Sequence, residues 1–125
     1  MENLFIKETL NSPRVILDQT KKRFEISGKS FPENARGFYQ PVFEWFRNLP
    51  APSAETIRLS LSFEYISSSS IIILKQLLSQ IKTLIDNGAS IEILWHYDLT
   101  DNDIKDTGEE YEKVVGMKFQ FIPKS

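Results

Sequence analysis

The chain has 125 residues, of which 41% are hydrophobic and 26% charged, and a chain of this size can bury a core of its own. Its 15 Lys and Arg residues against 17 Asp and Glu residues give a net charge of −2, which argues against a nucleic-acid partner because such proteins carry a basic face. The absence of cysteine excludes disulfides and thiolate metal sites.

The longest aliphatic run, residues 71–74, is far too short to cross a bilayer, and the first residues lack the pattern of a signal peptide. No glycine-rich phosphate loop supports a nucleotide cofactor. We therefore expect a single domain over residues 1–125 that is cytoplasmic, has no cofactor or metal and contacts no membrane.

Short apolar runs separated by turn residues predict three strands, at residues 4–7, 14–18 and 23–27. Apolar side chains at helical spacing predict a first helix over residues 34–49, with Pro41 near its start or kinking its first turns. Residues 56–65 alternate, with Ile57, Phe63 and Tyr65 among the apolar side chains of one face, which predicts a strand with one wet face.

An apolar stripe from Ile71 to Ile85 predicts a second helix that ends at Asn87-Gly88. Residues 90–97 alternate like a strand, Thr100 and Asp103 predict the start of a third helix, and residues 117–121 predict a last strand. This order requires crossover connections and a partly parallel sheet, while the polar side of nearly every strand places the helices mainly on one face. We expect a two-layer α/β domain with a mixed β-sheet.

Four consecutive hydroxyls, Ser67, Ser68, Ser69 and Ser70, follow the predicted strand and fill the turn that begins the second helix. One serine there is explained by an N-cap, whose oxygen accepts a hydrogen bond from a free helix amide; four are more than a cap requires. A helix N-terminus also tolerates a phosphate, so a modified serine would add charge at this turn without unfolding the domain.

A strand that runs into a serine-rich helix start is similar to the STAS domains of anti-sigma-factor antagonists, which are controlled by phosphorylation of a serine at that place. A closer resemblance, to the SiaC family of bacterial regulatory phosphoproteins, covers nearly the whole chain. It is carried by residues 12–18, 24–30, 32–34, 38–42 with Trp45, 65–70, 95–98, 108–111 and 119–122.

The SiaC resemblance implies a STAS-like fold without catalysis, whose unmodified form binds and activates a diguanylate cyclase in c-di-GMP signalling and biofilm control. It also implies a serine/threonine protein kinase that switches the protein off and a metal-dependent phosphatase that resets it. Ser68 stands at the family's phosphoacceptor Thr, with Ser67, Ser69 and Ser70 as alternates. Ser67 and Ile72 replace the family's usual Asn and Lys.

We expect the partner to contact the second helix and its neighbouring loops, at Tyr65, Ser67, Ser68, Ser69 and Ile72. The first helix is rich in aromatic residues, and Tyr39 or Phe43 is expected to remain outside the core as a further anchor.

Two alternatives stay open. One is an antagonist that acts on an anti-sigma factor or a related kinase. The other is a small enzyme or ligand-binding domain that uses His96, Asp98 and Glu92, which share one face of a strand. A single His at a strand end is more often structural, so we expect no catalytic residue here. The acidic stretch of residues 98–112 lacks the glycine of a calcium loop and is predicted to be a solvated helix face, or a docking surface for a basic partner.

Overall fold

One mixed sheet and three helices organise residues 2–50 and 55–125, the part of the chain that the computed structural model describes. The strands are β1 (Leu4–Ile6), β2 (Arg14–Asp18), β3 (Arg23–Ser30), β4 (Ile57–Ile66), β5 (Ile91–Asp98) and β6 (Phe119–Lys124), and the helices are α1 (Ala35–Arg47), α2 (Ser68–Asp86) and α3 (Asn102–Val115). Among the helices of these described ranges, none has the length and apolar character that a membrane crossing requires.

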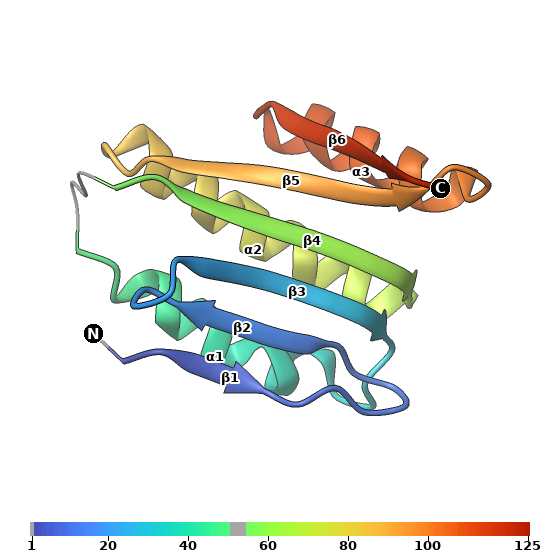
Figure 1. Cartoon of the computed structure of the whole chain (residues 1–125), viewed down its shortest axis with the longest axis horizontal. Helices are drawn as coiled ribbons and strands as arrows, with labels where there is room; N and C mark the ends of the chain where they lie inside the picture. The colour runs from blue at the N-terminus through green and yellow to red at the C-terminus, as the bar shows by residue number, and fades with distance from the viewer. Residues whose placement is uncertain (1, 51–54) are drawn as a thin grey trace.

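The strands lie side by side in chain order, from β1 at one edge to β6 at the other. β1, β2 and β3 are antiparallel, whereas β3, β4, β5 and β6 run parallel and are joined by the three helices. Figure 1 shows all three helices on the same side of the sheet, and α2 packs between α1 and α3. The expected two-layer α/β architecture with a mixed sheet is therefore confirmed.

The core lies between the helices and the covered face of the sheet. Leu59, Ile93 and Phe119 are neighbours across β4, β5 and β6, and all three are buried. The next residues along these strands point to the uncovered face, where Ser60 and Gln120 meet solvent more freely. This alternation is what the sequence pattern of one wet face predicts.

A β-bulge changes the alternation at the end of β4. Gly28 of β3, at φ +117°, pairs with Phe63, but the next residue, Lys29, pairs with Tyr65, which leaves Glu64 as the extra residue. An extra residue in one strand shifts its alternation by one position. The expectation that Tyr65 points to the same side as Phe63 is therefore wrong: Phe63 is buried, whereas Tyr65 is 53% exposed.

Other boundaries differ by a few residues. β3 continues to Ser30, beyond the expected end at residue 27, because the bulge lets it follow β4 further. Asp101, and not Thr100, caps α3, since its side chain accepts a hydrogen bond from the Ile104 N–H at 3.1 Å. Pro41 lies inside α1, which begins after Asn34.

Candidate functional site

The four serines of residues 67–70, called here the serine corner, lie where β4 ends and α2 begins (Figure 1). Ser67 has an extended backbone and is the N-cap of α2, and Ser68 is the first helical residue. The predicted junction of strand and helix is therefore confirmed. The amino end of a helix presents unpaired N–H groups and the positive end of the helix dipole, so the corner favours negative charge.

Two of the serines are occupied by structural hydrogen bonds. The Ser67 hydroxyl accepts a bond from the Ser70 N–H at 3.2 Å, which makes Ser67 the cap that the sequence predicts for one of the four. Ser70 is fully buried, and its hydroxyl accepts a bond from the Ser30 hydroxyl at 2.8 Å. A kinase cannot reach a hydroxyl that is sealed inside the core, so Ser70 is excluded as an acceptor.

Ser68 and Ser69 are the two serines that are free to react. Both are exposed, and within the described residues neither hydroxyl makes a hydrogen bond. Their backbone N–H groups are also without an acceptor in this part of the chain. The corner therefore offers a reachable hydroxyl beside two free amides, which is the arrangement that an anionic group requires.

Exposed apolar side chains flank the corner on both sides. Tyr65 makes an edge-to-face contact with Phe31, with ring centroids 5.7 Å apart, and Ile72, 59% exposed, lies one helical turn after Ser68. We call Phe31, Tyr65 and Ile72 the corner hydrophobics. Large apolar side chains left in water at one place are typical of a protein-binding surface.

Phe31 was missed from the sequence because it follows the end of β3 in a loop and belongs to no periodic pattern. Its backbone N–H donates to the Asn11 carbonyl at 2.9 Å, and the carbonyl of the preceding Ser30 accepts a bond from the Ser67 N–H at 2.8 Å. These bonds bring the Phe31 loop against the serine corner, although the two are more than thirty positions apart in the chain.

Tyr39 is not part of this surface, so the expectation that it anchors a partner is wrong. Its side chain is fully buried, and its hydroxyl bonds the Ser30 hydroxyl at 2.7 Å. Burial raises the pKa of Tyr39, and the bond to Ser30 opposes the shift only in part. Tyr39 faces the core because it lies on the same side of α1 as Val42 and Phe46. Phe43, the other candidate, is half-buried.

His96, Asp98 and Glu92 do not form a reactive cluster, although they share the uncovered face of β5. Glu92 pairs with Arg58 at 3.1 Å, and Asp98 accepts two bonds from Thr100, at 2.9 Å and 2.7 Å. These bonds from the Thr100 hydroxyl and N–H lower the pKa of Asp98. Each carboxylate is thus held by a partner of its own.

The surroundings of His96 do not favour general acid–base catalysis. Burial lowers the pKa of its imidazole, Lys124 adds to the lowering and Glu25 opposes it, so the ring is kept neutral. Its Nε2 atom is buried and has no hydrogen-bond partner among the described residues. The ring is hydrogen-bonded through Nε2 to no carboxylate or nucleophile of the described residues, so nothing here positions it as a general base.

The acidic residues of the stretch 98–112 lie at the end of β5, in the turn before α3 and in α3 itself. Asp101 caps the helix, and the Glu112 carboxylate accepts a bond from the Phe119 N–H at 2.7 Å. Among residues 2–50 and 55–125, no group of three or more His, Asp or Glu side chains is arranged to hold a metal ion. The helix face is otherwise exposed, as expected.

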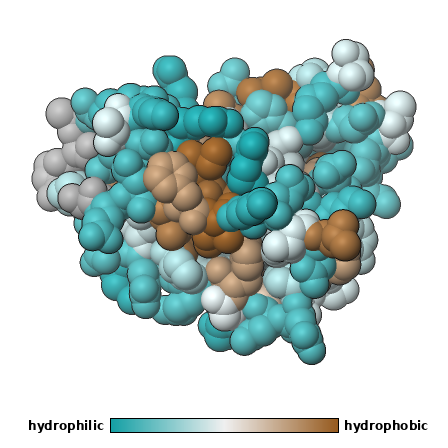
Figure 2. Space-filling model, turned by 60° about the horizontal axis from the view of Figure 1, so that its bottom comes forward, coloured by the Kyte–Doolittle hydropathy of each residue, from teal (hydrophilic) through white to brown (hydrophobic). Residues whose placement is uncertain are grey.

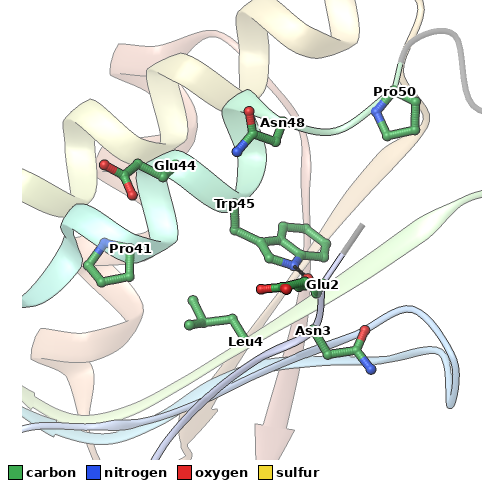
Figure 3. A pocket seen from close by; sticks show the side chains of 8 residues that line it. All are labelled: Glu2, Asn3, Leu4, Pro41, Glu44, Trp45, Asn48 and Pro50. Atoms are coloured by element: carbon green, nitrogen blue, oxygen red, sulfur yellow. Dashed lines mark hydrogen bonds between the residues drawn. The ribbon is translucent and has the colours of Figure 1, made fainter.

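A cavity of about 670 Å³ opens on the side of the molecule where β1 and α1 lie. Figure 3 shows Trp45 pointing toward Glu2, whose carbonyl accepts a bond from the indole N–H at 3.1 Å. The same side carries an apolar patch bordered by polar side chains (Figure 2). The cavity is lined by Glu2, Asn3, Leu4, Pro41, Glu44, Trp45, Asn48 and Pro50. None of these residues belongs to the serine corner, so this cavity is not part of the candidate site.

Comparison with known proteins gives a consistent result. A family model described as SiaC family regulatory phosphoprotein matches residues 6–124. A curated but uncharacterized protein of Pseudomonas aeruginosa (strain UCBPP-PA14) is 25% identical over 119 residues, which cover 95% of this chain and 94% of that protein.

Solved structures agree with the family match. The crystal structure of apo-SiaC from Pseudomonas aeruginosa is 25% identical and superposes with a TM-score of 0.84 over the full length of both chains. A second structure, of the diguanylate cyclase SiaD in complex with its activator SiaC from the same organism, contains a chain that is also 25% identical, with a TM-score of 0.83 over 96% of this chain and 97% of that one.

Proposed function

The chain belongs to the SiaC family of regulatory phosphoproteins, and we propose that its unmodified form binds and activates a diguanylate cyclase until phosphorylation of Ser68 releases the partner. The similar SiaC of Pseudomonas aeruginosa was crystallised as the activator of such a cyclase, SiaD. Because the family is regulatory, the protein acts by binding and not by catalysis.

The observation that carries the proposal is that the four serines of the corner differ in burial and in hydrogen bonding. Ser67 caps the helix and Ser70 is buried, so modification of either would disrupt a structural bond. Ser68 is exposed and makes no hydrogen bond through its side chain within the described residues. It also occupies the position at which the family resemblance places the acceptor.

Phosphorylation at this position changes binding without changing the fold. A phosphoserine adds nearly two negative charges, and at the first position of α2 these charges meet the free amides and the positive end of the helix dipole. A partner that covers the corner hydrophobics would bury the phosphate as well, and burying a charge without a matching cation is costly. The modified corner therefore remains folded but rejects an apolar partner.

The remaining parts of the switch are a serine/threonine protein kinase, which transfers phosphate to the corner, and a metal-dependent phosphatase, which removes it. Both are expected in the cytoplasm, the compartment that the cysteine-free composition favours. The partner is expected to contact Tyr65, Ser67, Ser68, Ser69 and Ile72, and the geometry adds Phe31.

The first experiment maps the modification. The protein is incubated with its cognate kinase and ATP, and the phosphorylated residue is identified by mass spectrometry. We expect phosphate mainly on Ser68 and a large loss of phosphate from the corner in a Ser68→Ala variant. Absence of phosphate from the whole serine corner would contradict the proposal.

The second experiment measures the consequence for the partner. Ser68→Asp should weaken binding to the diguanylate cyclase by roughly tenfold or more, since a charge is placed against the apolar surface that the partner covers. Ser79→Asp is the matched control, because it adds the same charge to another exposed serine of α2. Equal binding by both variants, or recovery of an anti-sigma factor in place of a cyclase from the native cell, would argue against this function.

A further inference from the structure

Three buried hydroxyls form a continuous chain beneath the serine corner. The Tyr39 hydroxyl of α1 lies 2.7 Å from the Ser30 hydroxyl at the end of β3, which in turn lies 2.8 Å from the Ser70 hydroxyl of α2. All three side chains have no exposed surface. These hydroxyl bonds therefore connect the first turn of α2 to the end of β3 and to α1.

The direction of the bonds follows from the number of protons. Ser30 donates its hydroxyl proton to Ser70, so Tyr39 must donate to Ser30, since a serine hydroxyl has one proton and two lone pairs. Tyr39 can do so at any ordinary pH because burial raises its pKa. Each link thus has a defined donor, and the chain has one arrangement.

Backbone bonds extend this chain to the corner itself. The Ser30 carbonyl accepts from the Ser67 N–H at 2.8 Å, and the Ser67 hydroxyl accepts from the Ser70 N–H. Ser30 therefore holds both ends of the first turn, at Ser67 through its backbone and at Ser70 through its side chain.

We propose that the chain of Tyr39, Ser30 and Ser70 is a positioning device that makes Ser68 the acceptor in preference to Ser69. The inference rests on the proposed function, because it concerns the same modification. Residues of an α-helix are about 100° apart around its axis. With Ser70 held inward, Ser68 lies about 160° from it and points outward, whereas Ser69 lies only about 100° away and points sideways.

A preference for Ser68 over Ser69 requires that the first turn of α2 be held in one orientation, because the ends of helices fray. The corner offers two adjacent free hydroxyls of identical chemistry, so only orientation distinguishes them. Burial of three hydroxyls is costly unless each is bonded, and a fully bonded polar network specifies one geometry where apolar packing would tolerate several.

The test compares variants that break the chain with a variant that disturbs the core elsewhere. Tyr39→Phe removes the donor to Ser30 but keeps the ring, and Ser70→Ala removes the acceptor at the other end. Ile81→Val is the control, since Ile81 is fully buried in α2 and lies about 16 Å along the helix from Ser70. Each protein is phosphorylated by the cognate kinase at a temperature where all are folded, and the phosphate on Ser68 and on Ser69 is quantified by mass spectrometry.

We expect the ratio of Ser68 to Ser69 modification to fall about two- to tenfold in Tyr39→Phe and Ser70→Ala, which is the range that the loss of one hydrogen bond allows, and to stay at the wild-type value in Ile81→Val. An unchanged ratio in both Tyr39→Phe and Ser70→Ala overturns the inference while leaving the proposed function intact. A wild-type protein that takes no phosphate at the corner overturns both.

Discussion

Alanine substitution of the four serines, one at a time, separates their structural roles most directly. Ser67→Ala removes the cap of α2 and should cost about 1 kcal/mol of the free energy of unfolding. Ser70→Ala removes a buried acceptor, leaves the proton of the Ser30 hydroxyl without an acceptor and should cost about 1–3 kcal/mol. Ser68→Ala and Ser69→Ala remove exposed hydroxyls without hydrogen bonds in the described chain and should stay within about 0.5 kcal/mol of wild type.

These differences are large enough to measure by thermal unfolding followed by circular dichroism. For a chain of this length the entropy of unfolding is near 0.26 kcal/mol/K, so a loss of about 1 kcal/mol lowers the melting temperature by about 4 °C. Ser67→Ala and Ser70→Ala should therefore melt at least a few degrees below Ser68→Ala. Ser79→Ala, at an exposed position further along α2, is the control for the change in helix propensity.

The scan can refute the reasoning in two ways. If Ser68→Ala is as destabilising as Ser67→Ala, the Ser68 hydroxyl has a structural partner and is not free for a kinase. If Ser70→Ala is neutral, the buried hydroxyl chain does not hold the first turn of α2. Either result would show that burial and hydrogen bonding have been assigned to the wrong serines.

Three further predictions concern the packing of α3, the histidine of β5 and the corner hydrophobics. Gly108→Ala should destabilise the protein by about 1–3 kcal/mol, because the new Cβ would lie 2.5 Å from Nε1 of the buried Trp95. Urea unfolding measures this change, and a stability equal to wild type would contradict the packing of Gly108 on Trp95. Stability should fall as the pH drops below about 6.5, because the folded state lowers the pKa of His96 and the unfolded chain therefore binds the proton more tightly. The melting temperature measured against pH tests this. If His96→Gln keeps the full pH dependence, that dependence belongs to other groups. Tyr65→Ala should weaken binding to the cyclase about tenfold or more in calorimetric titration, whereas Val114→Ala, at a similarly exposed apolar residue of α3, should not; equal effects would place the interface elsewhere.

Local patterns were sufficient to predict the elements and the place of the candidate site. Alternation along β4 and the apolar stripe of α2 locate the junction between them and place the four serines there, although the helix begins at Ser68, earlier than the stripe from Ile71 indicates. The single covered face was also predictable, because the strands keep a polar side. These features depend on residues that are near one another in the chain.

Features that depend on distant residues were not predictable. The exposure of Tyr65 results from a bulge beside Gly28 of the neighbouring strand. The burial of Tyr39 follows from its helical spacing to Val42 and Phe46, but its bond to Ser30 at the end of β3 depends on the fold. Phe31 reaches the corner only through backbone bonds made by a loop. The division of the serines into capped, free and buried follows from the same tertiary contacts, so the sequence alone predicts an acceptor region but cannot exclude Ser70.

The two consequences of a phosphate at Ser68 have opposite signs, and this distinguishes a binding switch from a folding switch. At the amino end of α2 the added charge should stabilise the helix by about 0.3–1 kcal/mol, which raises the melting temperature slightly or leaves it unchanged. The same charge lies one turn from the exposed Ile72 and should reduce affinity for a partner that covers this side chain. A phosphorylated protein that melts well below the unmodified one would mean that the phosphate disturbs the corner, and loss of binding would then follow from loss of structure and not from the charge.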